Sequence, residues 1–260
     1  MRIAVSPPTS ALHLLPLTGL QLCLAEYVLS NYEYRDVYAK LPPSETVILD
    51  TMVHERKGEG QAMSYGDLMD AHAAIKAGII VVPDDDHDPR ATLARLKEWA
   101  PKIHETYPWV EVMGVVPKAS NIDLWVQNLR NTIPLVDCIG LPMEVEALFP
   151  EGGRIAALAI CDKLLPSIKK IHLLGIRQDL TEIRIAAGYR RLLGADSARP
   201  ITLALQGVDW RDVDNGSRLP GKQPDYFDTP IQIIREHEEL IQCNIQYLLE
   251  QAQDKSLAPI

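Results

Sequence analysis

Residues 46–84, TVILDTMVHERKGEGQAMSYGDLMDAHAAIKAGIIVVPD, contain one complete strand, helix and strand pattern. The runs Thr46–Asp50 and Gly78–Val82 are short and rich in β-branched residues. Between them, Tyr65–Ala77 repeats apolar residues every three or four positions, as an amphipathic helix does. Two strands joined by a crossover helix form a βαβ unit. The stretch therefore predicts a parallel sheet.

The same alternation continues in both directions along the chain. Further strands are predicted at Arg2–Ser6, Glu111–Val116, Asp137–Leu141, Lys170–Leu174 and Leu193–Asp196. An eighth is expected at Ile201–Leu205. Further helices are predicted at Pro89–Thr106, Ile122–Asn131, Gly153–Lys169 and Leu180–Leu192. Because no Gly/Ser-rich linker interrupts the alternation, we expect residues 1–260 to form a single α/β domain, a (β/α)8 barrel.

The C-terminal part of the chain departs from this rhythm. Residues 208–228, VDWRDVDNGSRLPGKQPDYFD, are rich in Gly, Pro, Asp and Asn and predict a long irregular loop. A helix over 229–253 is expected to follow, with Thr229 as its N-cap and Pro230 at its first position. We expect this C-terminal helix to dock across the barrel.

Composition sets limits on the class of protein. The 260 residues are 47% hydrophobic and 23% charged, and the net charge of −9 argues against indiscriminate binding of polyanions. The four cysteines are scattered without CxxC spacing, which favours reduced thiols over a disulfide scaffold or a closed zinc site. No apolar run reaches the roughly 18 residues of a membrane span, and no cleavable signal sequence is evident. We expect a cytoplasmic protein with no membrane partner.

Three predicted strands end in an aspartate, namely Asp50, Asp84 and Asp196. In a (β/α)8 barrel the carboxyl ends of the strands surround the active site. Three carboxylates at one mouth repel one another unless a metal, a cationic substrate or a shared proton reduces the repulsion. Such a group of carboxylates suits acid/base or nucleophilic chemistry. The alternative is that each aspartate only N-caps the helix that follows.

Other residues give weaker indications. The hard oxygens of Asp84–Asp88 resemble a cation site, but consecutive residues of an extended segment point in different directions. His54 and His172 belong to no HExxH or paired-histidine spacing, and His172 is predicted to be a buried core group rather than a ligand. We therefore expect no metal. GxGxxG, GxxxxGK[ST] and GxSxG are absent, which argues against dinucleotide, P-loop and serine hydrolase sites.

At successive predicted strand ends, from about Ile48 to Pro200, stand the segments ILDTMVHE, VVPD, GVVP, IGLP, IHLLG and GADSARP. This ordered set resembles the tRNA-guanine transglycosylase superfamily, and within it the short DpdA-like proteins of phages and bacteria that place 7-deazaguanines in DNA. Members of the family are (β/α)8 barrels that exchange guanine for a 7-deazaguanine through a covalent glycosyl-enzyme intermediate.

The resemblance implies a pentosyltransferase that acts on DNA with a free 7-deazaguanine such as preQ0. It leaves room for accessory proteins, and it places the protein in the host cytoplasm if a phage encodes it. A base inside a duplex is unreachable, so the target would be flipped out or single-stranded.

The resemblance also implies residue roles. Asp196 matches the nucleophile that attacks C1′, Asp50 the acid/base partner, and Asp84 the carboxylate that binds the purine N1–H and exocyclic amine. Two carboxylates that divide nucleophile and acid/base roles are the solution of retaining glycosidases. The other implied base contacts are Gly140, Leu141, Leu174 and His54. The cations expected beside a phosphate backbone are Lys118, Arg177 and Arg199.

The sequence departs from this family in several places. The CxCxxC…H zinc site of the tRNA enzymes is missing, so we expect no zinc cofactor and favour DNA over tRNA. Thr51-Met52-Val53 replaces a glycine pair, and Val116-Pro117-Lys118 shows no glutamine for base contact. Three alternatives stay open: a tRNA-acting transglycosylase, a small-molecule barrel enzyme whose aspartates hold a divalent metal, and a catalytically silent barrel that serves as a binding subunit.

Overall fold

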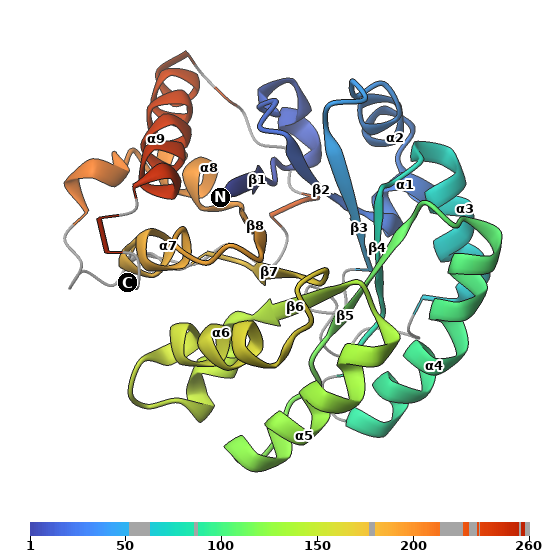
Figure 1. Cartoon of the computed structure of the whole chain (residues 1–260). Helices are drawn as coiled ribbons and strands as arrows, with labels where there is room; N and C mark the ends of the chain where they lie inside the picture. Colours follow the sequence, from blue (N-terminus) through green and yellow to red (C-terminus); the bar gives the residue numbers. More distant parts are fainter. Residues whose placement is uncertain are drawn as a thin grey trace.

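The computed structural model describes residues 1–51, 63–85, 88–176, 180–213, 226–228, 233, 235–254 and 256–257. Within these residues, eight parallel strands form a nearly closed barrel, and helices surround it (Figure 1). The strands are β1 (Arg2–Val5), β2 (Leu20–Leu24), β3 (Thr46–Asp50), β4 (Ile79–Val82), β5 (Glu111–Val115), β6 (Cys138–Pro142), β7 (Lys170–Leu174) and β8 (Leu192–Ser197). The predicted (β/α)8 fold is confirmed.

The strands pair in the order β1-β8-β7-β6-β5-β4-β3-β2, which leaves β1 and β2 at the two ends. The Arg2 side chain links these ends: its Nη1 donates to the Gly19 carbonyl at 2.8 Å, just before β2, and to Thr46 Oγ1 at 3.1 Å in β3. Because all strands run in one direction, their carboxyl ends lie together at one mouth of the barrel.

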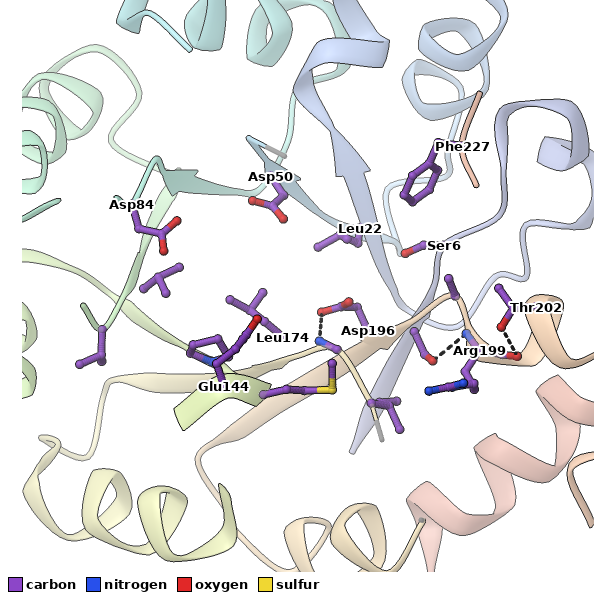
Figure 2. Close-up of a pocket in the computed structure, with 18 of the residues that line it drawn as sticks. Ser6, Leu22, Asp50, Asp84, Glu144, Leu174, Asp196, Arg199, Thr202 and Phe227 are labelled. Atoms are coloured by element: carbon purple, nitrogen blue, oxygen red, sulfur yellow. Dashed lines mark hydrogen bonds between the residues drawn. The ribbon is translucent and has the colours of Figure 1, made fainter. Parts of the chain in front are cut away.

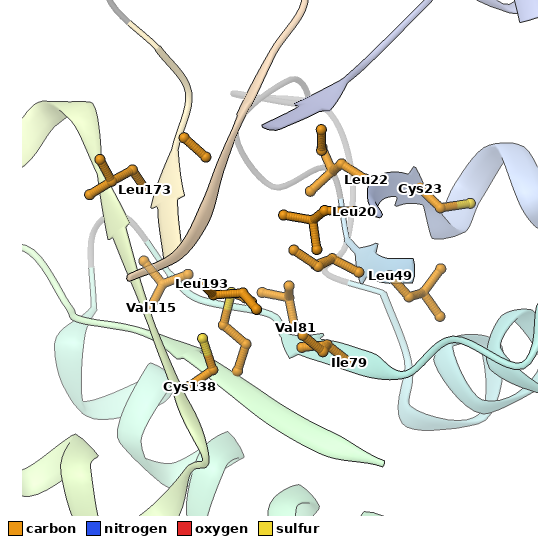
Figure 3. Packing of buried hydrophobic residues seen from close by; sticks show 14 of the residues in the cluster. Leu20, Leu22, Cys23, Leu49, Ile79, Val81, Val115, Cys138, Leu173 and Leu193 are labelled. Carbon is orange, nitrogen blue, oxygen red and sulfur yellow. The ribbon is translucent and has the colours of Figure 1, made fainter. Parts of the chain in front are cut away.

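Apolar side chains fill the barrel interior. Figure 3 shows Leu20, Val81 and Leu193, from β2, β4 and β8, pointing towards one another, and all three belong to the buried cluster. Space is tightest at Gly194 in β8, where a Cβ would lie 2.4 Å from the Arg2 carbonyl oxygen and 2.6 Å from Leu20 Cδ2. A glycine at this position therefore lets β8 approach β1 and β2 closely.

Gly194→Ala is expected to lower the free energy of unfolding by about 2 kcal/mol, because the backbone must move to admit the methyl group. The matched control is Gly66→Ala in α3 (Tyr65–Ile75), where the atom nearest to the new Cβ is 3.8 Å away. That change should raise stability by up to about 1 kcal/mol. Urea denaturation followed by circular dichroism measures both; wild-type stability of Gly194→Ala would contradict the close packing.

One predicted strand is wrong. Ile201–Leu205 does not form a strand, because this segment lies in α8 (Arg199–Ala204) and its C-cap. Pro200 occupies the first turn of α8, where a missing N–H costs no hydrogen bond. Ser197 Oγ accepts the Arg199 N–H at 3.0 Å and so helps to start the helix.

The strand that completes the barrel is β2, which the sequence analysis did not predict. All five of its residues, LQLCL, are buried, so no alternation marks the strand, and none is β-branched. The amide nitrogen of its polar residue, Gln21, is bound inside the fold: Nε2 donates to the Pro16 carbonyl at 2.8 Å and to Glu45 Oε2 at 2.6 Å, while the buried Oε1 has no partner among the described residues.

Most of the predicted helices form, with changed ends. Pro89–Thr106 is α4 as predicted, while the helix expected over 153–169 ends at Leu164 and the one expected over 180–192 spans only Thr181–Ala186. The remaining helical elements include α1 (Ala25–Ser30), α2 (Tyr32–Ala39), α5 (Ile122–Thr132), α6 (Gly153–Leu164), α7 (Thr181–Ala186) and the short 3-10 turns η1 (Thr9–Leu14), η2 (Ile133–Leu135), η3 (Met143–Leu148) and η4 (Trp210–Asp212).

The C-terminal helix α9 (Arg235–Gln253) packs against α8 (Figure 1). Asn244 joins the two: Oδ1 accepts the Trp210 N–H at 2.7 Å, and Nδ2 donates to the carbonyls of Pro200 (3.2 Å) and Val208 (3.0 Å). Parts of the predicted loop 208–228 and of the predicted helix 229–253, including Thr229 and Pro230, lie outside the described residues, namely 214–225, 229–232 and 234.

No helix in the described part of the chain combines the length and the apolar composition that a bilayer crossing requires.

Candidate active site

A cavity of about 410 Å³ opens at the carboxyl ends of the strands (Figure 2). The end of β3 contributes Asp50, the residues just after β4 contribute Asp84, and β8 contributes Asp196. The structure therefore brings together the three aspartates that the sequence analysis selected. Three other selected residues also line the cavity, namely Lys118, Leu174 and Arg199.

Asp196 is held by two N–H donors on one oxygen. Oδ1 accepts from His172 Nε2 at 3.0 Å and from the Gly175 backbone N–H at 3.1 Å. The side chain of Asp196 is 14% exposed, whereas that of His172 is fully buried. Within the described residues, Oδ2 of Asp196 makes no hydrogen bond, so it is the oxygen that can meet a ligand.

His172 has a role that its sequence context did not indicate. Its Nδ1 is buried and has no partner among the described residues. A neutral imidazole with its proton on Nε2 fits these surroundings, because it donates to Asp196 and leaves no buried N–H unpaired. His172 is thus a buried group, as predicted, but it also orients the carboxylate beside it.

Asp50 and Asp84 do not serve as N-caps of α3 and α4, the helices that follow them. The N-cap of α3 is Ser64, whose Oγ accepts from the Asp67 N–H at 3.1 Å. The N-cap of α4 is Asp88, whose Oδ1 accepts from Arg90 N–H at 2.9 Å and Ala91 N–H at 3.2 Å. Asp50, at the end of β3, and Asp84, just after β4, instead line the cavity (Figure 2).

The cavity carries charges of both signs. Among the described residues, its carboxylates are Asp50, Asp84, Glu144 and Asp196, and its cations are Lys118 and Arg199. Burial lowers the pKa of the Arg199 guanidinium, because the charge is partly removed from water. An anion bound next to Arg199 would replace that lost solvation. The site suits a ligand that offers N–H donors to the carboxylates and an anionic group to the cations.

Sequence reasoning missed Ser6 and Glu144. Ser6 follows β1, and its buried Oγ faces the cavity without a partner among the described residues (Figure 2). Glu144 lies two residues beyond Pro142, the last residue of β6. The strand-end rule that selected the aspartates would have found Ser6, which closes the predicted strand Arg2–Ser6, but not Glu144, which lies three residues beyond the predicted strand Asp137–Leu141.

Phe227 also lines the cavity and had no sequence signal, because it belongs to the irregular segment 208–228. The Phe227 carbonyl accepts from Thr9 N–H at 3.2 Å and Thr9 Oγ1 at 2.6 Å. The neighbouring Tyr226 hydroxyl donates to the Ser6 carbonyl at 3.0 Å. These three bonds fix a C-terminal segment beside the end of β1.

Some predicted residues stand elsewhere. Gly140 and Leu141 lie within β6 and do not line the cavity, although Pro142, the next residue, does. A Cβ on Gly140 would come within 3.1 Å of Leu174 Cδ1, so this glycine makes room for a side chain of the cavity wall. His54 and Arg177 lie outside the described residues.

In the part of the chain that the structure describes, no three His, Cys, Asp or Glu side chains gather as a metal ion would require. Asp86 and His87 of the acidic segment lie outside that part. Comparisons of the chain with known protein families and with curated proteins found no match.

Proposed function

We propose that this protein is a base-exchange glycosyltransferase that replaces guanine in DNA with a 7-deazaguanine such as preQ0. The observation that carries the proposal is the convergence of Asp50, Asp84 and Asp196 on one cavity, with Asp196 oriented by two N–H donors. The cavity volume of about 410 Å³ lies within the range of roughly 300–1,000 Å³ that small-molecule sites occupy.

In the first displacement, Oδ2 of Asp196 attacks C1′ of the target deoxynucleotide. The bond from C1′ to N9 breaks, its electron pair stays on guanine, and Asp50 gives a proton to the departing base. A carboxylate suits this attack because the transition state carries positive charge on the sugar. The product is an ester between Asp196 and the DNA, together with free guanine.

In the second displacement, N9 of the incoming 7-deazaguanine attacks C1′ from the face that guanine left. The ester bond breaks, Asp196 regains its charge, and Asp50 takes the proton that N9 loses. Two inversions restore the β configuration, and the exchange consumes no other reagent.

In this proposal, different residues of the cavity bind the base and the phosphates. Asp84 accepts hydrogen bonds from N1–H and the exocyclic amine of the base, and Leu174 packs against one face of the ring. Lys118 and Arg199 neutralise phosphates of the DNA backbone, which is how a chain of net charge −9 binds a polyanion locally. Arg177 and His54 would add to these contacts.

The test is incubation of the purified protein with single- or double-stranded DNA and labelled guanine or preQ0, followed by digestion of the DNA to nucleosides. Label is expected in the nucleoside fraction. A parallel reaction with tRNA distinguishes the polymer, and transfer to tRNA alone would exclude DNA as substrate. No transfer to either polymer, with or without candidate partner proteins, would refute base exchange.

A further inference from the structure

Behind the cavity wall lies a buried arginine that the proposed chemistry does not use. Arg154 belongs to α6 and is 2% exposed. Its Nε donates to Glu182 Oε1 at 2.9 Å and its Nη2 to Glu182 Oε2 at 2.6 Å. A buried charge is stable only when it is paired and fully hydrogen-bonded, so the remaining N–H groups of this guanidinium also need acceptors.

Those donors bind backbone carbonyls at the ends of two strands. Nη1 donates to Leu141 O at 3.3 Å in β6 and to Leu174 O at 2.8 Å in β7. Nη2 donates to Gly175 O at 2.8 Å, directly after β7. Arginine suits this task because its planar fork fixes several acceptors at once, which a lysine ammonium cannot do with the same geometry.

One peptide unit connects Arg154 to Asp196. The peptide between Leu174 and Gly175 is trans, so its carbonyl and its N–H point in opposite directions. The carbonyl faces Arg154, and the N–H donates to Asp196 Oδ1 at 3.1 Å, as the dashed line in Figure 2 shows. Gly175 has φ +75°, a left-handed conformation that favours glycine.

We infer that Arg154 is a positioning residue for Asp196 and acts through the Leu174–Gly175 peptide. The guanidinium holds the carbonyl, the planar peptide turns its N–H onto Oδ1, and Oδ2 is left facing the cavity. The positive charge also polarises this peptide in the direction that strengthens the bond to a carboxylate. We call this chain of hydrogen bonds, from Arg154 through the Leu174–Gly175 peptide to Asp196, the relay. Its consequence for catalysis rests on the proposed function, whereas the relay itself does not.

The relay is tested by NMR without any substrate. Carbonyl-¹³C leucine with ¹⁵N glycine selects the amides of Gly175 and Gly194, the glycines that follow a leucine. Arg154→Lys is expected to move the Gly175 amide proton upfield, as its hydrogen bond lengthens, and Asp196→Asn should move the same signal in the same direction. An unmoved Gly175 signal in Arg154→Lys would overturn the proposal.

Two further variants separate positioning from simple stabilisation. Glu182→Gln removes the charge pair but leaves the three carbonyl contacts of Arg154, so it should lower the melting temperature and leave the Gly175 signal in place. Arg191→Lys is the matched control, because Arg191 binds the carbonyls of Asp162 and Leu165 away from the cavity. A Gly175 shift in Glu182→Gln as large as in Arg154→Lys would assign the effect to the ion pair and overturn the relay.

In the base-exchange assay, Arg154→Lys is expected to lower kcat about tenfold with KM for DNA unchanged, since the nucleophile is misaligned but the binding groups remain. Arg191→Lys should keep wild-type kcat. Equal losses in both variants would contradict a positioning role. Absence of base exchange in the wild type would refute the proposed function, while the amide signals would still decide the relay.

Discussion

Asp196→Asn is expected to reduce base exchange by at least about 10⁴-fold and to abolish the covalent adduct with DNA. The amide has nearly the shape of the carboxylate and retains one oxygen for the N–H of Gly175 or His172, so the fold should persist. It cannot attack C1′, and loss of a nucleophile removes catalysis almost completely.

The adduct is the more specific measurement. Wild-type protein mixed with DNA in the absence of an incoming base, then denatured, should carry a DNA strand that a denaturing gel displays as a slower band. Asp196→Asn should show none. A band of equal strength in Asp196→Asn would assign the nucleophile to another residue, even if overall exchange had slowed.

The chain offers a matched control at the other end of the barrel. Asp137 Oδ2 accepts from His104 Nε2 at 2.8 Å and from the Val112 backbone N–H at 2.9 Å, so one histidine and one backbone N–H bind one carboxylate oxygen, as at Asp196. Asp137→Asn therefore perturbs a cluster with the same kinds of donor away from the cavity, although the side chains of Asp137 and His104 are both 40% exposed. It should keep exchange activity, which separates loss of the nucleophile from loss of a carboxylate that is hydrogen-bonded to a histidine and a backbone N–H.

Asp50→Asn is expected to lower kcat for guanine exchange by about 10²–10⁴-fold, the usual contribution of a general acid or base, with little change in KM for DNA. The Asp50 side chain lines the cavity, and its Oδ1 accepts the Thr51 N–H at 2.7 Å, a bond that the asparagine oxygen can keep. The loss would therefore report on the missing proton rather than on a disturbed backbone.

A second substrate tests whether Asp50 acts as the acid. N7-methylated guanine in DNA is already cationic and departs as a neutral base, so it needs no proton from the enzyme. Asp50→Asn should release 7-methylguanine at nearly the wild-type rate, and the covalent adduct should then accumulate because the incoming base lacks a proton acceptor. Equal slowing with guanine and 7-methylguanine would show that Asp50 is not the acid.

The strand positions were predictable where the local pattern was strong. Thr46–Asp50 and the run before Asp84 combine β-branched residues with an aspartate at or just after the end, and both form strands. β2 was not predictable in this way, because LQLCL is buried along its whole length and its neighbours in the sheet, rather than its own propensity, make it a strand. Ile201–Leu205 forms no strand because Pro200 and the Ser197 side chain help to start a helix there.

The candidate site was predictable as far as it depends on strand ends. Asp50, Asp84 and Asp196 reach the cavity because parallel strands deliver their last residues to one mouth. The hydrogen bond between His172 and Asp196 depends on register between two strands, and the carbonyl contacts of Arg154 depend on how α6 packs. Neither follows from the spacing of residues in the sequence.

The bonds from Thr9 and Tyr226 that fix Phe227 beside β1 join residues 218 and 220 positions apart. Closing so long a loop is slow compared with forming local contacts, and it cannot begin before both partners exist. During synthesis, the eight strands are complete at Ser197, yet the cavity still lacks its aromatic wall. The wall of the cavity can therefore become complete only after residue 227 has left the ribosome, late in the synthesis of the chain.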